Sequence, residues 1–382
     1  LPSRRTFARN IMKDAQRMEK RLTIKLATIK HLAVRADAWS AHNRSFLGLT
    51  IHWIDRPTLR REKGVLACVS VTEAQTYELL NTTLQDVFIK YNIHSKVVSV
   101  TTDNGRNFVK CFQVFGENSE DGVLAHEEAD SDDEVNLEDE DDATPLEISD
   151  LMESRHDEQN EAELESGELT QLPPHRRCVA HTLNLIATTD LNRVPGWTCA
   201  PKPIFIKVKN KAIALWNRQN RCTQVAAVIR KEIGKLFCTP VVTRWNSLYD
   251  AMKDLGDALE SKLHKINKIC LEQKISCFNN VDKDIIVEYV TVMTPIAQAL
   301  DYLQSEKAAY MGVMLPSLYC IQQKIGKMQA SGTLKYCSSL TEYILDSPLS
   351  SETRPKGFKG RFAKLFNNRN LLAATATHPC YK

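Results

Sequence analysis

Residues 72–92 (TEAQTYELLNTTLQDVFIKYN) and 96–105 (KVVSVTTDNG) decide the fold class. In the first segment, Leu80, Leu84 and Phe88 share one face of a helix. The second segment is a short apolar run rich in β-branched residues, which is typical of a buried strand that stops at a polar tip. A buried strand that is reached through a helix pairs in parallel with its neighbour. The pattern therefore predicts an α/β fold.

The sequence on either side extends this unit. Three runs with strand composition precede the helix and predict an antiparallel meander: 31–39 (HLAVRADAW), 45–55 (SFLGLTIHWID) and 61–71 (REKGVLACVSV). Thr72 is the predicted N-cap of the helix. After the fourth strand, residues 107–116 (NFVKCFQVFG) predict a helix that ends at its glycine. The predicted order is three strands, a helix, a strand and a helix.

Charge is segregated along the 382 residues. Residues 117–170 hold 23 Asp and Glu and one Arg, a net charge of −22, whereas the rest of the chain has a net charge of +25. So acidic a segment cannot bury enough apolar surface to fold, and we predict a disordered insertion. It is either a tolerated loop, an electrostatic shield over a basic groove, or an interaction tail. The basic remainder indicates a nucleic-acid partner, unless the cations only solvate helix faces.

The rest of the sequence is helical in pattern. Apolar residues recur at three- and four-residue spacing from Arg176 onward, with predicted breaks or kinks at Pro240, Pro295 and Pro316. The predicted organisation is a basic helical lead-in (1–30), the first part of an α/β core (31–116), the acidic insertion (117–175), a helical domain (176–365) and the start of a return to the core (366–382).

Two classes of protein are excluded by composition. The chain has no run of about 18 apolar residues, so we predict no integral membrane protein. Its 11 cysteines form no C-x2-C pair, and their odd number in a long chain argues against a disulfide framework. The cysteines are better explained as the reduced thiols of a cytosolic or nuclear protein than as disulfide partners.

Two carboxylates stand at the ends of apolar strands. Asp37 lies in RADAWS and Asp103 in VTTDNG. If the first and fourth strands are neighbours, both carboxylates converge at one edge of the sheet and form a site for Mg²⁺ or Mn²⁺. The alternative is that Asp37 caps a turn and Asp103 opens the next helix. Arg35 is close enough in sequence to pair with Asp37, or to hold a phosphate.

Four segments in one order carry a family resemblance: ADAWSAHNRSFLGLTIHWID, TTDNGRNFVKCF, RCVAHTLNLI and TRWNSLYDAM. Together they resemble hAT-superfamily transposases and the BED-finger proteins derived from them. The resemblance implies an RNase H-like mixed sheet, incomplete here, which is interrupted by a large all-α insertion domain. It also implies DNA cleavage and rejoining by three acidic residues with Mg²⁺ or Mn²⁺.

The resemblance assigns roles to particular residues. Asp37 and Asp103 match the first two catalytic and metal-binding carboxylates, but no Ser-x-Glu-Arg-type motif supplies the third. Cys178 and His181 match the C-x2-H motif near the active site; alone they are half of a zinc site, or core packing, so we do not expect zinc. Arg244 and Trp245 match an Arg-Trp motif whose Trp stacks on an extruded base, the alternative being a Trp in a helical core.

The resemblance leaves three readings of function. The chain is part of a nuclear DNA transposase, inactive alone because its third carboxylate is missing; or a domesticated nuclear DNA-binding regulator without catalysis; or a fragment without an independent role. We expect a longer protein with a BED finger and a dimerisation region, hence a homo-oligomer. We expect DNA as the partner, and neither a membrane nor a small-molecule substrate.

Overall fold

The computed structural model describes residues 3–41, 44–71, 76–117, 171–191, 204–241, 246–305, 307–345 and 357–381. It divides into two compact units, Leu1–Cys178 (unit 1) and Val179–Lys382 (unit 2). The predicted acidic insertion lies outside the described residues, except for its two ends. In the described ranges, no helix is both long enough and apolar enough to cross a membrane.

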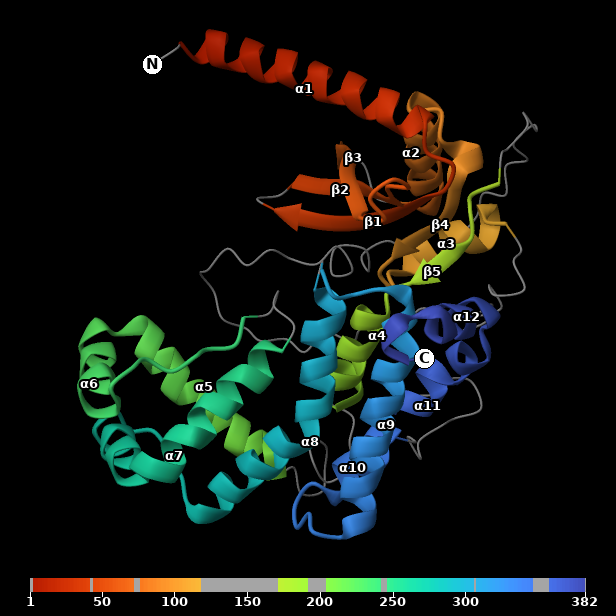
Figure 1. Cartoon of the computed structure of the whole chain (residues 1–382). Helices are drawn as coiled ribbons and strands as arrows, with labels where there is room; N and C mark the ends of the chain where they lie inside the picture. The colour runs from red at the N-terminus through yellow and green to blue at the C-terminus, as the bar shows by residue number, and fades with distance from the viewer. Residues whose placement is uncertain are drawn as a thin grey trace, which may run out of the picture. The chain divides into compact units, whose positions relative to one another are not determined.

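Unit 1 is built on one mixed five-stranded sheet with the order β3-β2-β1-β4-β5 (Figure 1). β1 pairs antiparallel with β2 and parallel with β4, and β5 pairs parallel with β4. The predicted meander and the predicted parallel fourth strand are therefore confirmed. The strands are β1 (Leu32–Ala41), β2 (Arg44–Ile54), β3 (Arg61–Val71), β4 (Val97–Thr102) and β5 (His175–Arg177).

Helices cover one face of this sheet. The buried side chains of α2 (Tyr77–Lys90) and α3 (Arg106–Phe115) form a single apolar core with Val34 and Val100 of the sheet. The short 3-10 turn η1 (His94–Lys96) leads from α2 into β4. Because strand side chains alternate, residues next to Val34 and Val100 in sequence point to the opposite face.

The N-terminal helix α1 (Arg4–Ala27) is anchored at its end. Only Leu26 is buried, and Leu22 packs against the same core. Figure 1 shows the helix running outward from the sheet. Phe7, Ile11 and Met18 continue the apolar stripe toward the N-terminus but are more than half exposed.

Unit 2 is helical throughout its described residues. Its longest helices are α7 and α8, which pack against each other, and Phe205 of α5 lies 4.7 Å from Tyr289 of α8, ring centre to ring centre. The elements are α4 (Val179–Leu185), the π-helical turn η4 (Ile186–Asp190), α5 (Ile204–Arg221), α6 (Thr223–Ile233), α7 (Ser247–Glu272), α8 (Asn280–Gln304), η6 (Met311–Val313), α9 (Met314–Ser331), α10 (Ser338–Leu345), α11 (Gly357–Phe362), η7 (Ala363–Asn367), α12 (Arg369–Thr377) and η8 (Pro379–Tyr381).

A buried ion pair ties η4 to α11 in unit 2. Asp190 is 1% exposed and accepts two hydrogen bonds from Arg361, at 2.9 Å from Nε and 2.7 Å from Nη2. The backbone N–H of Gly357 donates a third, at 3.2 Å. This fork geometry satisfies a charge that would be costly to bury alone.

Several predicted boundaries were wrong. The N-cap of α2 is Thr76, whose Oγ1 accepts from the N–H of Leu79, and not Thr72. α8 runs on through Pro295, so the predicted break is absent there, whereas a kink at this residue stays a prediction. Pro316 is in the first turn of α9, where its missing N–H would have no intrahelical partner, so neither proline ends a helix. Pro240 does lie between α6 and α7, as predicted.

Candidate functional site

The strand register brings Asp37 and Asp103 to the same level of the sheet. Arg35 of β1 pairs with Thr101 of β4 in parallel register. Asp37 and Asp103 each follow two residues later, so they stand opposite each other where the paired segment ends. Asp37 lies on the face opposite to Val34, away from the apolar core, and Asp103 comes directly after the last residue of β4. Adjacent parallel strands are about 4.8 Å apart, which is within the reach of two carboxylates that share one cation.

Asp37 lies within β1 and is exposed. Its backbone is paired with Gly48 of β2 rather than placed at a turn, so the turn-cap alternative is wrong for this residue. Arg35 Nη2 lies 3.8 Å from Asp37 Oδ2, and both side chains are more than half exposed. The predicted pairing is thus present, but an exposed ion pair of this length contributes little to stability.

Asp103 is fixed by the turn that starts α3. Its Oδ1 accepts a hydrogen bond from the N–H of Gly105 at 2.9 Å. The N-cap of α3 is Gly105, so Asp103 precedes the cap rather than forming it. A Cβ atom at position 105 would lie 2.9 Å from the same Oδ1, so any other residue there would require the Asp103 carboxylate to shift.

A largely buried histidine supports the residue before Asp103. His175 Nε2 lies 2.8 Å from Thr102 Oγ1, and Thr102 Oγ1 donates to the backbone oxygen of Asp103, also at 2.8 Å. Because the single hydroxyl proton of Thr102 is used in this way, His175 Nε2 must be the donor of the other bond. The His175 ring stacks on Phe112 of α3 at 4.3 Å. Burial, with a smaller effect from the Arg177 charge, lowers the pKa of His175 to about 3.

Cys178 and His181 fall in different units. The N–H of Cys178 donates to the backbone oxygen of Thr102 at 2.8 Å, which extends the pairing of β5 with β4 by one residue. His181 is in α4 of unit 2. Both residues are half-buried. Their assigned role near the active site stays a prediction.

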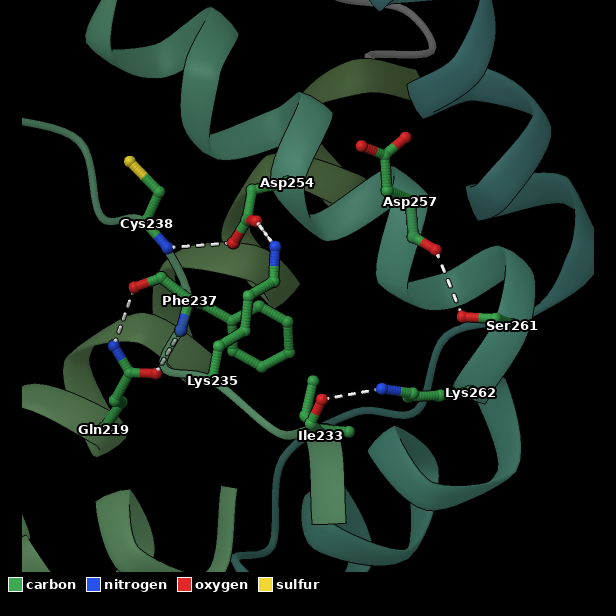
Figure 2. A network of polar contacts seen from close by, with 9 residues as sticks. All are labelled: Gln219, Ile233, Lys235, Phe237, Cys238, Asp254, Asp257, Ser261 and Lys262. Carbon is green, nitrogen blue, oxygen red and sulfur yellow. Dashed lines mark hydrogen bonds and ion pairs between the residues drawn. The ribbon is translucent and has the colours of Figure 1, made fainter. Parts of the chain in front are cut away.

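Arg244 and Trp245 lie outside the described residues, but the segment that leads to them is firmly held (Figure 2). Gln219 of α5, 6% exposed, donates to the backbone oxygen of Phe237 at 3.0 Å and accepts from its N–H at 2.8 Å. Asp254 of α7 accepts from the N–H of Cys238 at 2.9 Å and pairs with Lys235.

A second part of the same network fixes the C-terminal end of α6 (Figure 2). Lys262 Nζ donates to the backbone oxygen of Ile233 at 2.6 Å. Gly234 then ends α6 in the left-handed conformation, at φ 86°. Both ends of the segment from Ile233 to Cys238 are therefore tied to α7, and Phe237 is also tied to α5.

The chemistry of the donors fits a hard divalent cation in part. Two carboxylates with room for water are a common protein contribution to Mg²⁺ binding. Among the described residues, no three His, Cys, Asp or Glu side chains gather to hold a metal ion.

Three residues of the strands around this site were not singled out from the sequence: Trp39, His175 and Arg176. Trp39 is on the same face of β1 as Asp37, and the other two belong to β5. β5 has only three residues and no apolar alternation, so the sequence carried no usable signal for it.

Comparisons with known proteins agree with this fold. Residues 35–125, which include Asp37 and Asp103, match the model of the ZBED1 RNase-like domain. Two proteins of Zea mays, the Putative AC transposase and the Putative AC9 transposase, are each 24% identical over 253 residues, or 65% of this chain. The Putative transcriptional regulator tpeD of Talaromyces stipitatus is 30% identical over 108 residues, or 28% of this chain.

These matches confirm the resemblance to hAT-type transposase-derived proteins and the RNase H-like class of the sheet. The chain spans about a quarter of the length of the two maize relatives, at 26% and 25%. It spans 13% of the fungal one.

Proposed function

We propose that this chain is the DNA-binding, metal-binding part of a hAT-type transposase-like protein of the nucleus. The observation that carries the proposal is the register of β1 and β4, which pairs Arg35 with Thr101 and so supports a position of Asp37 near Asp103 at the carboxyl ends of two parallel strands. The likeness to two maize proteins named as transposases supports it.

In this proposal Asp37 and Asp103 hold Mg²⁺ or Mn²⁺. The bound cation would supply charge stabilisation to a phosphodiester group. The chain's own residues orient the carboxylates: the Gly105 N–H fixes Asp103 Oδ1, and the hydroxyl of Thr102, supported by His175, fixes the backbone at Asp103. With two of the three implied carboxylates, we expect this chain alone to bind DNA without cutting it.

The remaining assignments belong to the same proposal. Trp245, next to Arg244, stacks on an extruded base, and Cys178 and His181 contribute near the carboxylates without zinc. The complete protein acts as a homo-oligomer.

A second candidate function is a DNA-binding transcription regulator without catalysis. It is favoured by the likeness to a relative named as a putative transcriptional regulator, which covers 28% of this chain. Both candidates require salt-sensitive DNA binding, because phosphate contacts release counterions. They differ in whether Asp37 and Asp103 bind a metal ion.

Binding of Mn²⁺, measured by electron paramagnetic resonance, distinguishes the two candidate functions. The wild-type chain is titrated beside Asp37→Asn, Asp103→Asn and, as the matched control, Asp86→Asn on the exposed side of α2. We expect the first two substitutions to abolish the bound-ion signal and the control to preserve it. Equal binding by all four proteins would contradict the metal site, and salt-sensitive DNA binding without any bound Mn²⁺ would favour the regulator.

A further inference from the structure

Two arginines form one row across the exposed face of the sheet. Arg35 of β1 pairs with Thr101 of β4, and Thr101 pairs with Arg176 of β5. The neighbouring row is Val34, Val100 and His175, of which the first two are buried in the core and the third stacks on α3. Side chains alternate along a strand, so Arg35 and Arg176 point to the other face.

The arginine row lies next to the row of carboxylates. Arg35 precedes Asp37 by two residues in β1, and the Arg35 side chain is 57% exposed. Arg176 is the middle residue of β5. Guanidinium groups bind phosphate oxygens in a bidentate fork. The spacing of two strands, about 9.6 Å, separates the Cα atoms of the pair, so each arginine can serve a different phosphate.

An exposed indole completes this face. Trp39 has the same orientation as Arg35 and Asp37 along β1 and is 40% exposed. Its ring lies over Gly48, where a Cβ atom would come within 2.6 Å of Trp39 Cζ3, and it stacks on Phe46 at 5.8 Å. Contact with Phe46 and the absence of a side chain at position 48 fix the position of the indole on this face.

A single-strand nucleic-acid site has two components, which are cations and an exposed aromatic ring. The cations hold the backbone, and the ring stacks on a base whose π-face is accessible only when it is unpaired. A base in a duplex is already stacked on both sides. The combination therefore favours a strand with unpaired bases over an intact duplex.

We propose that the exposed face of this sheet binds the unpaired end of a DNA strand, with Arg35 and Arg176 on backbone phosphates and Trp39 stacked on a base. This inference rests on the proposed DNA-binding function and narrows it to a strand type and a set of residues. The strand end is held beside Asp37 and Asp103.

The experiment uses the full 382-residue chain and a labelled single-stranded DNA, with its duplex as the comparison. Fluorescence anisotropy gives the affinity at several salt concentrations. The variants are the Arg35→Ala/Arg176→Ala double substitution, Trp39→Ala and Trp39→Phe. The matched control is Arg230→Ala/Lys231→Ala, which removes the same charge from two exposed positions of α6.

We expect the arginine double variant to lower the slope of log affinity against log salt by about 0.7 per lost contact, whereas the control retains the slope. Trp39→Ala should weaken single-strand binding by about five- to a hundredfold. Trp39→Phe keeps a stacking ring and should stay within about threefold of wild type. The quenching of intrinsic fluorescence on binding should decrease in Trp39→Phe even though the affinity is kept.

Each result separates this inference from the function on which it rests. Salt-sensitive DNA binding with the same slope in the arginine double variant, or the same affinity in Trp39→Ala, overturns the inference and leaves DNA binding intact. Tighter binding of the duplex than of the single strand also overturns it. A wild-type chain that binds neither DNA overturns both.

Discussion

His175 should make the stability of unit 1 depend on pH in a way that one substitution removes. Burial lowers its pKa from 6.5 to about 3 in the folded protein. Below pH 6.5 the unfolded chain therefore binds a proton that the folded chain does not, and stability falls as the pH decreases toward 3. The loss reaches about 2 kcal/mol at about pH 5.

The stability of the His175→Phe variant, plotted against pH, should cross the corresponding wild-type curve. Phenylalanine keeps the ring stack on Phe112 but loses the hydrogen bond to Thr102 Oγ1, which costs about 1 kcal/mol at neutral pH. It cannot take up a proton, so the variant is less stable than wild type at about pH 7.5 and more stable at about pH 5. The profiles should cross near about pH 5.8.

Hydrogen exchange of peptides from β4, corrected for the intrinsic exchange rate at each pH, measures this difference within unit 1. The matched control is His264→Gln, an exposed position of α7 in unit 2. Its profile should run parallel to that of wild type. If the His175→Phe profile also runs parallel to wild type from about pH 7.5 to about pH 5, the buried neutral histidine is refuted.

Three further predictions concern packing, a buried charge and a buried thiol. Gly48→Ala should displace the Trp39 ring and cost about 1–3 kcal/mol in urea unfolding, with a shift in intrinsic fluorescence; an unchanged spectrum would contradict the close contact. Asp190→Asn leaves the Arg361 charge buried without its partner and should cost about 3–5 kcal/mol, measured as a lower melting temperature of the helical unit; a change under about 1 kcal/mol would show that the pair is solvated. Burial raises the pKa of Cys111 to about 12, so its thiol should react with an aromatic disulfide reagent at about pH 8 only on unfolding, while exposed cysteines react at once; prompt labelling of Cys111 would refute its burial.

Much of the sheet was predictable because its signals are local. Apolar alternation marked β1 to β3, and a buried strand reached through a helix implied that β4 is parallel. β5 was not predicted, since His175, Arg176 and Arg177 carry no alternation and their place follows only from pairing with β4. Thr76 was missed as the cap of α2 because Thr72 has the same local chemistry.

The candidate site was predictable to the extent that it depends on strand ends. The neighbouring positions of Asp37 and Asp103 follow from the order of two adjacent strands. The supporting role of His175 and the row of Arg35 with Arg176 depend on β5, which is distant in sequence. The motif at Arg244 and Trp245, which lies outside the described residues, could be named from the family resemblance alone.

The pairing of β5 also dictates where unit 1 can be cut for laboratory expression. Charge alone suggests a cut at Gly116, before the acidic residues. A fragment ending there would lack β5, so the N–H of Val100 would lose the oxygen of Pro174 and the oxygen of Thr102 would lose the N–H of Cys178. β4 would become a bare edge strand, which is prone to pair with other molecules and aggregate. A soluble recombinant unit 1 has to include Cys178, even if most of the acidic residues are replaced by a short linker.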